Sequence, residues 1–263
     1  MKINDALVVY THPAAGESKK TLKKVKDVLK KYKTHFNLAN RDKLRRNQFE
    51  KRGLVVAVGG DGTFLRAAQF IEKEAMLGVN ADIRKKEGFF MEADKRNFGI
   101  KLKKILDGKF KIQKLPRLEA YINGRKIGAL ALNEFYIGPK KGYHGAKYTI
   151  QIGSKKERHK SSGIIVTTPA GSYAWAKAAH RKIMPLDSKN FQFVVREPYE
   201  GKVFGNYRLK HGILKANESI KISSEMLDGV IVSDSVGKEF AFRNGSNATI
   251  KMSNNYLNLV VTK

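Results

Sequence analysis

The stretch 54–66, LVVAVGGDGTFLR, constrains the fold more than any other part of the chain. Its apolar, β-branched beginning predicts a buried strand, and the apolar spacing from Phe64 to residue 74 predicts a helix. The turn between them carries three glycines, which are Gly59, Gly60 and Gly62. Glycine allows positive φ and brings bare N–H groups close to a ligand, while a helix start adds its positive dipole end. The stretch therefore predicts a phosphate-binding turn.

Asp61 does not suit a phosphate cradle, because a carboxylate repels the anion that the turn would hold. Two functions would explain it: binding a divalent cation, or accepting the proton of a hydroxyl that is being phosphorylated. The alternative is structural, with Asp61 or Thr63 capping the N-terminus of the helix. A glycine-rich turn alone does not decide between these interpretations.

The first part of the chain alternates strands with helices. A strand at 5–10, an amphipathic lysine-rich helix, the strand before Gly59 and a strand at 76–80 predict a parallel sheet. A further helix is predicted over 94–106. Ligands bind at the carboxyl ends of the strands in such sheets. Asn80 ends one of these strands, so it either points into the ligand crevice or is an ordinary loop residue.

The pattern changes near residue 113. Asn123-Gly124 between two apolar stretches is a strong signal for a two-residue hairpin. Further short strands are predicted at 147–152, 164–167, 191–195, 219–223, 230–233, 240–242, 248–252 and 257–261. We therefore expect an α/β fold in which an N-terminal domain with a parallel sheet, residues 1–112, is followed by a C-terminal β-sandwich-like domain, residues 113–263.

Asn133 and Glu134 interrupt an apolar strand at 129–137. Neighbouring strand residues face opposite sides, so at least one of the two polar side chains points toward packed material and needs partners. An amide and a carboxylate suit a ribose, whose hydroxyls donate to the carboxylate and exchange hydrogen bonds with the amide. The alternative is a strand end at a solvated edge.

A second strand, turn and helix pattern covers 160–175 and ends at Trp175, the only tryptophan of the chain. An aromatic ring beside a glycine turn offers a stacking surface for a flat base, and nearby N–H and hydroxyl groups can read the edge of that base. Packing in the core is the alternative function of Trp175.

The composition limits the partners without selecting one. The chain has 52 Lys and Arg against 24 Asp and Glu, a net charge of +28, which attracts polyanions unless it only reflects a lysine-rich proteome. Zero cysteines exclude disulfides and thiolate metal sites. No apolar run approaches the roughly 20 residues of a membrane span, and no targeting segment is evident before the first strand. We expect a cytoplasmic protein with no membrane partner and no specific nucleic-acid partner.

Three motifs together resemble the NAD kinase family: GGDGT at 59–63, Asn133-Glu134, and TPAGSYAW at 168–175. Their order and spacing fit, and the similarity runs from about residue 54 to about 250. Further segments are similar to the mitochondrial NAD kinase branch, namely 78–82, 131–134, 160–163 and 195–198. Diacylglycerol and sphingosine kinases share the first motif, whereas the other two motifs make the resemblance specific.

The resemblance implies phosphorylation of the adenosine ribose 2′-hydroxyl of NAD, giving NADP. It implies ATP as the phosphoryl donor, with polyphosphate left open, and Mg²⁺ or another divalent cation. It also implies a nucleotide cleft between the two domains and a homodimer or higher homo-oligomer. No set of protein metal ligands is predicted.

Carried over onto this sequence, the resemblance makes Asp61 the general base and the surrounding glycines with Thr63 the triphosphate cradle. Asn133 and Glu134 would hold the NAD ribose, and the segment 172–175 the base or the nicotinamide region. Asp234 is a candidate for metal or ATP binding. The candidate binding residues are Gly59, Gly60, Gly62, Thr63, Asn80, Asn133, Glu134, Ser172, Tyr173, Ala174, Trp175 and Asp234.

Two other functions stay open. A lipid kinase of the diacylglycerol or sphingosine type shares the glycine and aspartate motif, and a basic surface would bring it to an anionic membrane. A non-catalytic polyanion-binding protein with a kinase fold would bind nucleic acid in a salt-sensitive manner. Ser162, Tyr173 and Trp175 depart from the common bacterial pattern, which leaves NAD against NADH as substrate undecided.

Overall fold

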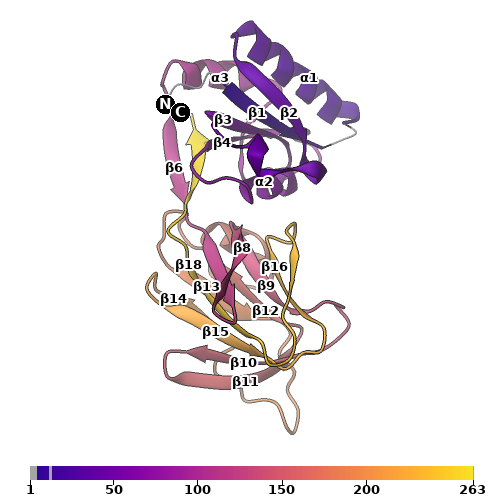
Figure 1. Ribbon diagram of the computed structural model, residues 1–263, viewed down its shortest axis with the longest axis vertical. Coiled ribbons are helices and arrows are strands. Elements are labelled where there is room, and N and C mark those ends of the chain that lie inside the picture. Colours follow the sequence, from indigo (N-terminus) through magenta and orange to yellow (C-terminus); the bar gives the residue numbers. More distant parts are fainter. Residues whose placement is uncertain (1–4, 12–13, 263) are drawn as a thin grey trace. The chain divides into compact units, whose positions relative to one another are not determined.

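The computed structural model describes residues 5–11 and 14–262, which form two compact units. The first unit runs to Lys114 and takes up the chain again at Leu257, and the second is Leu115–Tyr256. Figure 1 shows helices and strands in the first unit and mainly strands in the second. The expected α/β class is confirmed. No helix in the described ranges is both long and apolar enough to cross a bilayer.

The first unit is built on a parallel sheet with the strand order β2-β1-β3-β4-β19-β6, and β5 also pairs with β4. Every pair among β1 to β5 is parallel, as is β19 with β4. The strands are β1 (Asp5–Tyr10), β2 (His35–Asn40), β3 (Leu54–Gly59), β4 (Ala75–Asn80), β5 (Met91–Asp94), β6 (Lys111–Leu115) and β19 (Leu257–Val261). The helices are α1 (Gly16–Lys31), α2 (Asp61–Ala68) and α3 (Phe98–Leu106), with short 3-10 turns η1 (Arg41–Lys43) and η2 (Arg46–Gln48).

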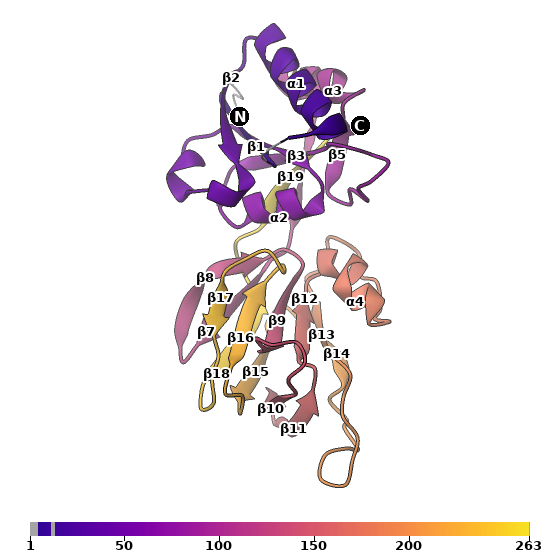
Figure 2. The same cartoon turned by 90° about the vertical axis from the view of Figure 1, so that its right-hand side faces the viewer.

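Helices α1 and α3 lie side by side in both views (Figures 1 and 2). Val25 and Leu29 of α1, with Leu102 of α3, are completely buried in one core with the strands. Strands β3 and β4 are buried along their whole length, as expected for central strands of a parallel sheet. This sheet fixes the positions of the loops at its carboxyl edge.

The second unit consists of two antiparallel sheets, each with six strands. One has the order β11-β10-β15-β18-β7-β8: β7 (Leu118–Ile122), β8 (Arg125–Ala131), β10 (Ala146–Ile152), β11 (Lys155–Ser161), β15 (Ser219–Ser224) and β18 (Asn247–Met252). The other has the order β14-β13-β12-β9-β16-β17: β9 (Glu134–Pro139), β12 (Ile164–Thr167), β13 (Phe191–Val195), β14 (His211–Leu214), β16 (Gly229–Ser233) and β17 (Glu239–Ala241). Buried side chains from both sheets form a single core, which is the arrangement of a β-sandwich. The turn η3 (Ala170–Tyr173) and the short helix α4 (Trp175–Ala178) follow β12.

The structure differs from the sequence-based elements at several places, and it contains the strands β2, β6, β11 and β14, which the sequence analysis did not predict. The strand β19 pairs with β4 in the first unit, although the predicted domain 113–263 included it. Helix α2 ends at Ala68 rather than near residue 74, because the amides of Phe70 and Ile71 turn back in tight i to i−3 hydrogen bonds. The helix predicted from residue 94 begins later, at Phe98, since 91–94 pairs as the strand β5.

Candidate functional site

The glycine turn lies between β3 and α2, at the carboxyl edge of the parallel sheet. A Cβ on Gly59 would lie 2.3 Å from Thr63 Oγ1, so packing alone requires glycine there. A Cβ on Gly62 would meet no protein atom within 4 Å, and this residue is exposed. None of the three glycines has a positive φ, contrary to the expectation, because α2 starts directly at Asp61 after an extended Gly60. The space beside Gly62 is therefore open to a ligand.

Asp61 fastens the loop between β4 and β5 to this turn. Its Oδ2 accepts hydrogen bonds from the amides of Gly88 and Phe89, both at 3.1 Å, and its Oδ1 accepts the amide of Phe90 at 3.0 Å. The N-cap of α2 is Gly60 and no side chain caps the helix, so the capping interpretation is wrong for Asp61 and for Thr63. A carboxylate offers about four acceptor positions, so three amide donors leave room for one more donor.

Asn80 holds the same loop from the opposite side. Its Oδ1 accepts the amide of Asp82 at 3.0 Å, and its Nδ2 donates to the carbonyl of Lys86 at 3.1 Å. The side chain is buried. Gly88 has a φ of +74°, and a Cβ there would lie 2.5 Å from Asn80 Nδ2. The structure thus gives Asn80 a positioning function, and ligand binding by Asn80 stays a prediction.

A cavity of about 220 Å³ lies at the carboxyl ends of β1 and β3. Gly59, Thr11, Ser18 of the first turn of α1, and the side of Lys86 line it. The start of a helix, hydroxyl groups and a lysine are groups that bind phosphate. The sequence analysis did not identify Ser18 or Lys86 as site residues. The loop before α1 follows the end of a strand, which is where ligands bind in parallel sheets, and this signal could have pointed to Ser18.

Arg41 reaches the glycine turn from η1 and was also missed. Its Nη1 donates to Thr63 Oγ1 at 3.1 Å, and the same oxygen lies 3.3 Å from Thr11 Oγ1. Arg41 Nε is buried and has no hydrogen-bond partner among the residues that the structure describes. The Asp42 carboxylate, 3.6 Å from Arg41 Nε, also lies 3.5 Å from Arg66. Two arginines thus share one carboxylate, which leaves excess positive charge beside the turn.

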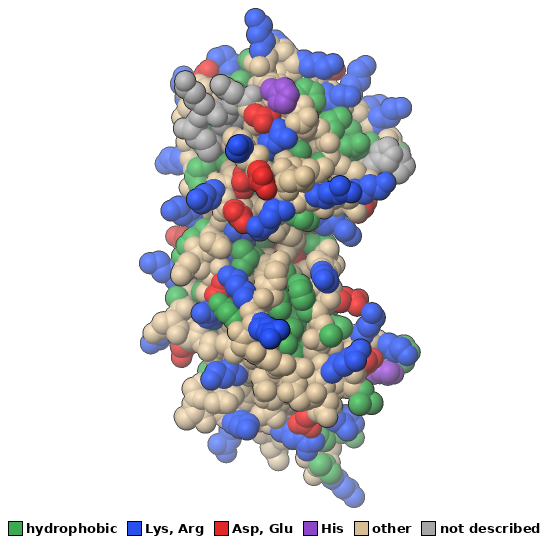
Figure 3. Space-filling model, in the orientation of Figure 1, with side chains coloured by type: hydrophobic (Ala, Val, Ile, Leu, Met, Phe, Trp, Pro, Cys, Tyr) green, Lys and Arg blue, Asp and Glu red, His purple; other side chains and the backbone are tan. Residues whose placement is uncertain are grey.

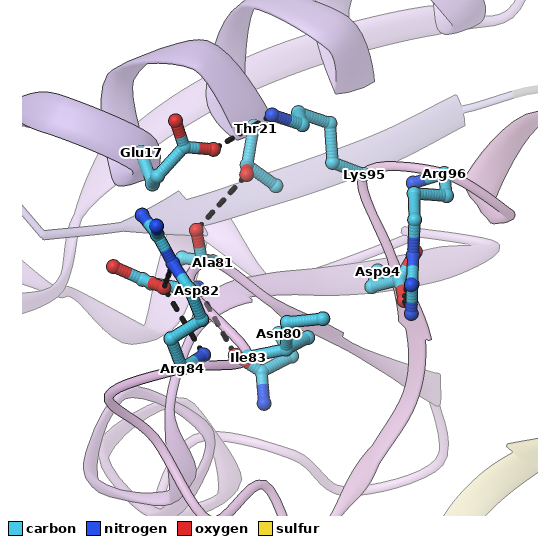
Figure 4. A pocket seen from close by; sticks show the side chains of 10 residues that line it. All are labelled: Glu17, Thr21, Asn80, Ala81, Asp82, Ile83, Arg84, Asp94, Lys95 and Arg96. Atoms are coloured by element: carbon cyan, nitrogen blue, oxygen red, sulfur yellow. Dashed lines mark hydrogen bonds and ion pairs between the residues drawn. The ribbon is translucent and has the colours of Figure 1, made fainter.

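A second pocket in this unit, of about 180 Å³, lies between the start of α1 and the loops after β4 and β5 (Figure 4). Its cations are paired: Lys95 with Glu17 at 2.6 Å, Arg96 with Asp94 at 2.6 Å, and Arg84 with Asp82 at 3.6 Å. The ammonium of Lys95 lowers the pKa of Glu17 to about 2. Because these charges balance, the cavity at Gly59 suits a polyphosphate chain better than this pocket does.

In the second unit, Asn133 and Glu134 lie where β8 turns into β9. Both side chains are buried, and Asn133 Oδ1 and Glu134 Oε2 have no hydrogen-bond partner within the described part of the chain. Burial, together with the negative charge of Asp234, raises the pKa of Glu134 to about 8. The solvated-edge interpretation is therefore wrong. Two buried polar atoms without hydrogen-bond partners are costly unless a ligand supplies hydroxyl groups, which can both donate and accept.

Asp234 holds this turn in place. Its Oδ1 accepts the amides of Asn133 at 2.6 Å and Glu134 at 3.2 Å, and its Oδ2 accepts the amide of Leu132 at 3.0 Å. Burial raises the pKa of Asp234 to about 7, against these three amides and the nearby Arg117, which favour the charged form. The residue adopts a φ of +53°. The carboxylate is used by the protein itself, and metal or ATP binding by Asp234 stays a prediction.

The motif at 168–175 packs directly against the same turn. The amide of Thr168 donates to the carbonyl of Asn133 at 2.8 Å, and a Cβ on Gly171 would lie 2.2 Å from that carbonyl oxygen. The structure therefore brings together the second and third motifs. Ser172 is completely buried, with its Oγ between the carbonyl of Pro169 and the amide of Met184. Its hydroxyl is occupied in shaping η3.

Trp175 is half-buried and stacks on Tyr136, with ring centroids 5.5 Å apart. The guanidinium of Arg196 lies 4.6 Å from the indole centroid. Trp175 and Arg196 line a cavity of about 510 Å³. Tyr173 is partly exposed, and Ala174 is half-buried. Ligand contacts of residues 172–175 stay predictions. Core packing, the alternative function of Trp175, accounts only for the buried part of its side chain.

Comparison with known proteins agrees with the motifs. Residues 4–110 match the sequence model of the ATP-NAD kinase N-terminal domain. The first unit of the chain is therefore similar to the N-terminal domain of the NAD kinase family. The chain is 27% identical to a probable NADH kinase of Oryza sativa over 253 residues, 88% of this chain and 77% of the rice protein. It is 28% identical to an NAD kinase of Thermoplasma volcanium over 203 residues, 76% of this chain and 70% of that protein.

Two solved kinase structures share the fold of this chain. An NAD kinase from Archaeoglobus fulgidus in complex with ATP superposes with a TM-score of 0.78 at 23% identity, covering 98% of this chain and 93% of that one. Yeast NADH kinase complexed with NADH superposes with a TM-score of 0.80 at 14% identity, covering 100% and 84%. At these identities the likeness concerns the fold.

Proposed function

We propose that this protein is an NAD kinase that transfers the terminal phosphoryl group of ATP to the adenosine ribose 2′-hydroxyl of NAD, giving NADP. The match of residues 4–110 to the ATP-NAD kinase N-terminal domain supports the reaction class. The observation that carries the substrate assignment is the pair of buried polar atoms without hydrogen-bond partners among the described residues, Asn133 Oδ1 and Glu134 Oε2. Ribose hydroxyls both donate and accept hydrogen bonds, so they can satisfy this pair whether the Glu134 carboxyl is protonated or charged.

Asp61 is proposed as the general base. A ribose hydroxyl is a weak acid, so a positioned carboxylate that takes its proton assists attack on the terminal phosphorus. The three amides of 88–90 fix the orientation of this carboxylate and leave one acceptor position for the hydroxyl. The proton passes to Asp61 as the new O–P bond forms and the bond to the departing ADP breaks.

The cavity at Gly59 is proposed for the phosphates of ATP. The open side of Gly62, the start of α1 and Lys86 support this placement, and Arg41 adds positive charge behind Thr63. Charge in this position stabilises the negative transition state of phosphoryl transfer. A phosphorylation assay with polyphosphate in place of ATP tests whether polyphosphate can also serve as the phosphoryl donor.

Magnesium is proposed to arrive with the nucleotide. No group of three or more His, Asp or Glu side chains that could hold a metal occurs among the described residues. Mg²⁺ keeps several waters and binds substrate phosphates with one or two carboxylates, so a dedicated protein cage is not required. Bound to the phosphates, the ion would neutralise their charge.

The finer assignments belong to the same proposal. The partners are NAD and ATP, with neither a membrane nor a specific nucleic acid. The protein is proposed to act in the cytoplasm as a homodimer or higher homo-oligomer and to resemble the mitochondrial-type branch most closely. The similarity to a probable NADH kinase of Oryza sativa makes NADH a substrate to be compared with NAD.

The test is to incubate the protein with ATP, Mg²⁺ and either NAD or NADH, and to measure NADP or NADPH. We expect a product with at least one substrate, and a Glu134→Gln variant with a raised KM for the dinucleotide but an unchanged KM for ATP. Diacylglycerol and sphingosine in place of NAD should give no phosphorylated lipid. Absence of product from both dinucleotides under conditions where the protein is folded would overturn the proposal.

A further inference from the structure

A basic groove runs between helices α1 and α3 of the first unit, and the proposed reaction does not use it. We call it the α1–α3 groove; it has a volume of about 590 Å³. Its cationic lining residues are Lys24, Lys31, Arg96, Lys103, Lys104 and Lys109. Among the described residues that line it, the acidic one is Asp107, whose Oδ2 already binds Lys103 Nζ at 2.8 Å. Arg96 is paired as well, with Asp94 at 2.6 Å. The other four cations, Lys24, Lys31, Lys104 and Lys109, give the groove an excess of positive charge.

Lys and Arg are concentrated along this groove. They make up 52 of the 263 residues of the chain but six of the eleven that line the groove. On the face of the molecule that Figure 3 shows, Lys and Arg side chains are scattered and interspersed with Asp and Glu. The groove lining is richer in cations than the chain as a whole, which includes the apolar core.

The floor of the α1–α3 groove is apolar. Val28 is almost fully buried, and a Cβ on Gly99 would lie 3.7 Å from the Val28 side chain, which shows how closely the two helices approach there. Ile100 beside it is 65% exposed, and the ring of Tyr32 lies at one end. Ile100 therefore presents an exposed apolar side chain next to the apolar floor of the groove.

We propose that the α1–α3 groove binds a short, acidic, amphipathic helix of a partner protein. Its apolar side chains would cover Ile100 and the floor at Gly99, and its carboxylates would face the lysines on both walls. Helix-in-groove recognition uses this combination of apolar anchors and charged rims. Complementary charge gives the contact its specificity and speeds association.

The dimensions favour such a peptide over other polyanions. The lining part of α1, Lys24 to Tyr32, spans roughly 12 Å at 1.5 Å per residue, which matches two to three turns of a helix. A nucleic acid would need a longer cationic track and several aromatic rings for stacking, whereas one tyrosine lines this groove. A membrane surface would need several projecting apolar side chains. In this groove Ile100 projects, whereas Val28 is buried.

The probe is a fluorescein-labelled peptide of 14 residues with Glu on one helical face and Leu at i, i+3, i+7 and i+10. Its control has the same composition, but its leucines are distributed around the helix. Fluorescence anisotropy with the full chain should give a dissociation constant at least tenfold lower for the amphipathic peptide. Equal affinity for the two peptides would mean that charge alone binds them, which overturns the proposal.

Matched variants locate the contact. Lys24→Glu with Lys109→Glu changes one exposed lysine at each side of the groove, and Lys155→Glu with Lys156→Glu makes the same charge change on the exposed strand β11. We expect the first pair to weaken peptide binding at least tenfold and the second less than twofold, with NADP formation retained by both. Ile100→Ser, which leaves the charge unchanged, should weaken binding about fivefold.

Other outcomes reject the inference. Equal weakening by both lysine pairs would show general attraction to a basic protein. A labelled dT20 oligonucleotide or phosphatidylserine vesicles that bind more tightly than the peptide, and lose binding in the Lys24→Glu and Lys109→Glu variant, would assign the groove to a different class of partner.

Discussion

Replacing Asp61 by Asn separates its two functions, proton acceptor and clamp of the loop 88–90. An amide has one oxygen, so it can accept from Gly88 and Phe89 or from Phe90, and its NH₂ group then faces the remaining donor. At least one charge-assisted hydrogen bond is lost. Such bonds contribute about 1.5–3 kcal/mol, and the half-exposed position of Asp61 reduces this to about 1–2 kcal/mol. The melting temperature should therefore fall by roughly 2–8 °C.

The loss of the base adds a larger kinetic effect. General base catalysis contributes about 10²–10⁴-fold, so kcat for NADP formation should fall by at least about 100-fold while the KM for ATP changes little. Steady-state kinetics with saturating Mg²⁺ and a thermal melt of the same preparation measure both effects.

Gly88→Ala is the comparison that isolates the clamp. It forces a left-handed φ of +74° on alanine and places its Cβ 2.5 Å from Asn80 Nδ2, yet leaves the Asp61 carboxylate intact. It should destabilise the protein by a similar amount but lower kcat less than tenfold. Equal losses of kcat in the two variants would mean that Asp61 acts only by holding the loop 88–90 in place. A kcat of Asp61→Asn within threefold of the wild type would refute the function of Asp61 as general base.

Three further predictions concern the turns. Burial raises the pKa of Glu134 to about 8, so the stability that this group contributes is complete below its unfolded pKa of about 4.5 and is lost as the pH rises toward 8. The melting temperature of Glu134→Gln minus that of the wild type should therefore be larger at pH 8 than at pH 5. The same difference at both pH values, measured by calorimetry, would contradict this prediction. Gly59→Ala should destabilise by about 1–3 kcal/mol through its clash with Thr63, measured by urea denaturation, whereas Gly62→Ala should keep its stability and bind ATP less tightly in calorimetric titration. Asp234→Asn should raise the KM for NAD but not for ATP, because it loosens the turn that presents Glu134; an equal rise in both would argue against a positioning function.

Patterns of neighbouring residues were sufficient to predict the local architecture. The apolar run before Gly59 predicted the central strand β3, since a strand that is covered on both faces is apolar along its length. The Asn123-Gly124 pair predicted the turn between β7 and β8, because both residues take the positive φ that a tight hairpin needs. The α/β class followed from these elements.

The uses of individual side chains were harder to predict. Nothing in the GGDGT motif indicates that the amides of 88–90 occupy the Asp61 carboxylate, because those residues lie far along the chain. Ser172 has the right chemistry for a ligand contact but turns inward to Met184. Arg41 carries no motif at all and reaches Thr63 only because β1 and β2 lie beside β3 in the sheet.

The sequence alone determined the strands β1, β3 and β4, the helix α1, the hairpin turn at Asn123-Gly124 and which family the chain resembles, since these depend on residue types at short spacing. Tertiary structure decided that the final strand β19 returns to the first sheet, that Asp234 holds the turn at Asn133, and that α1 and α3 form a basic groove. Each of these depends on contacts between residues distant in the chain, which packing and hydrogen bonding select and local patterns do not record.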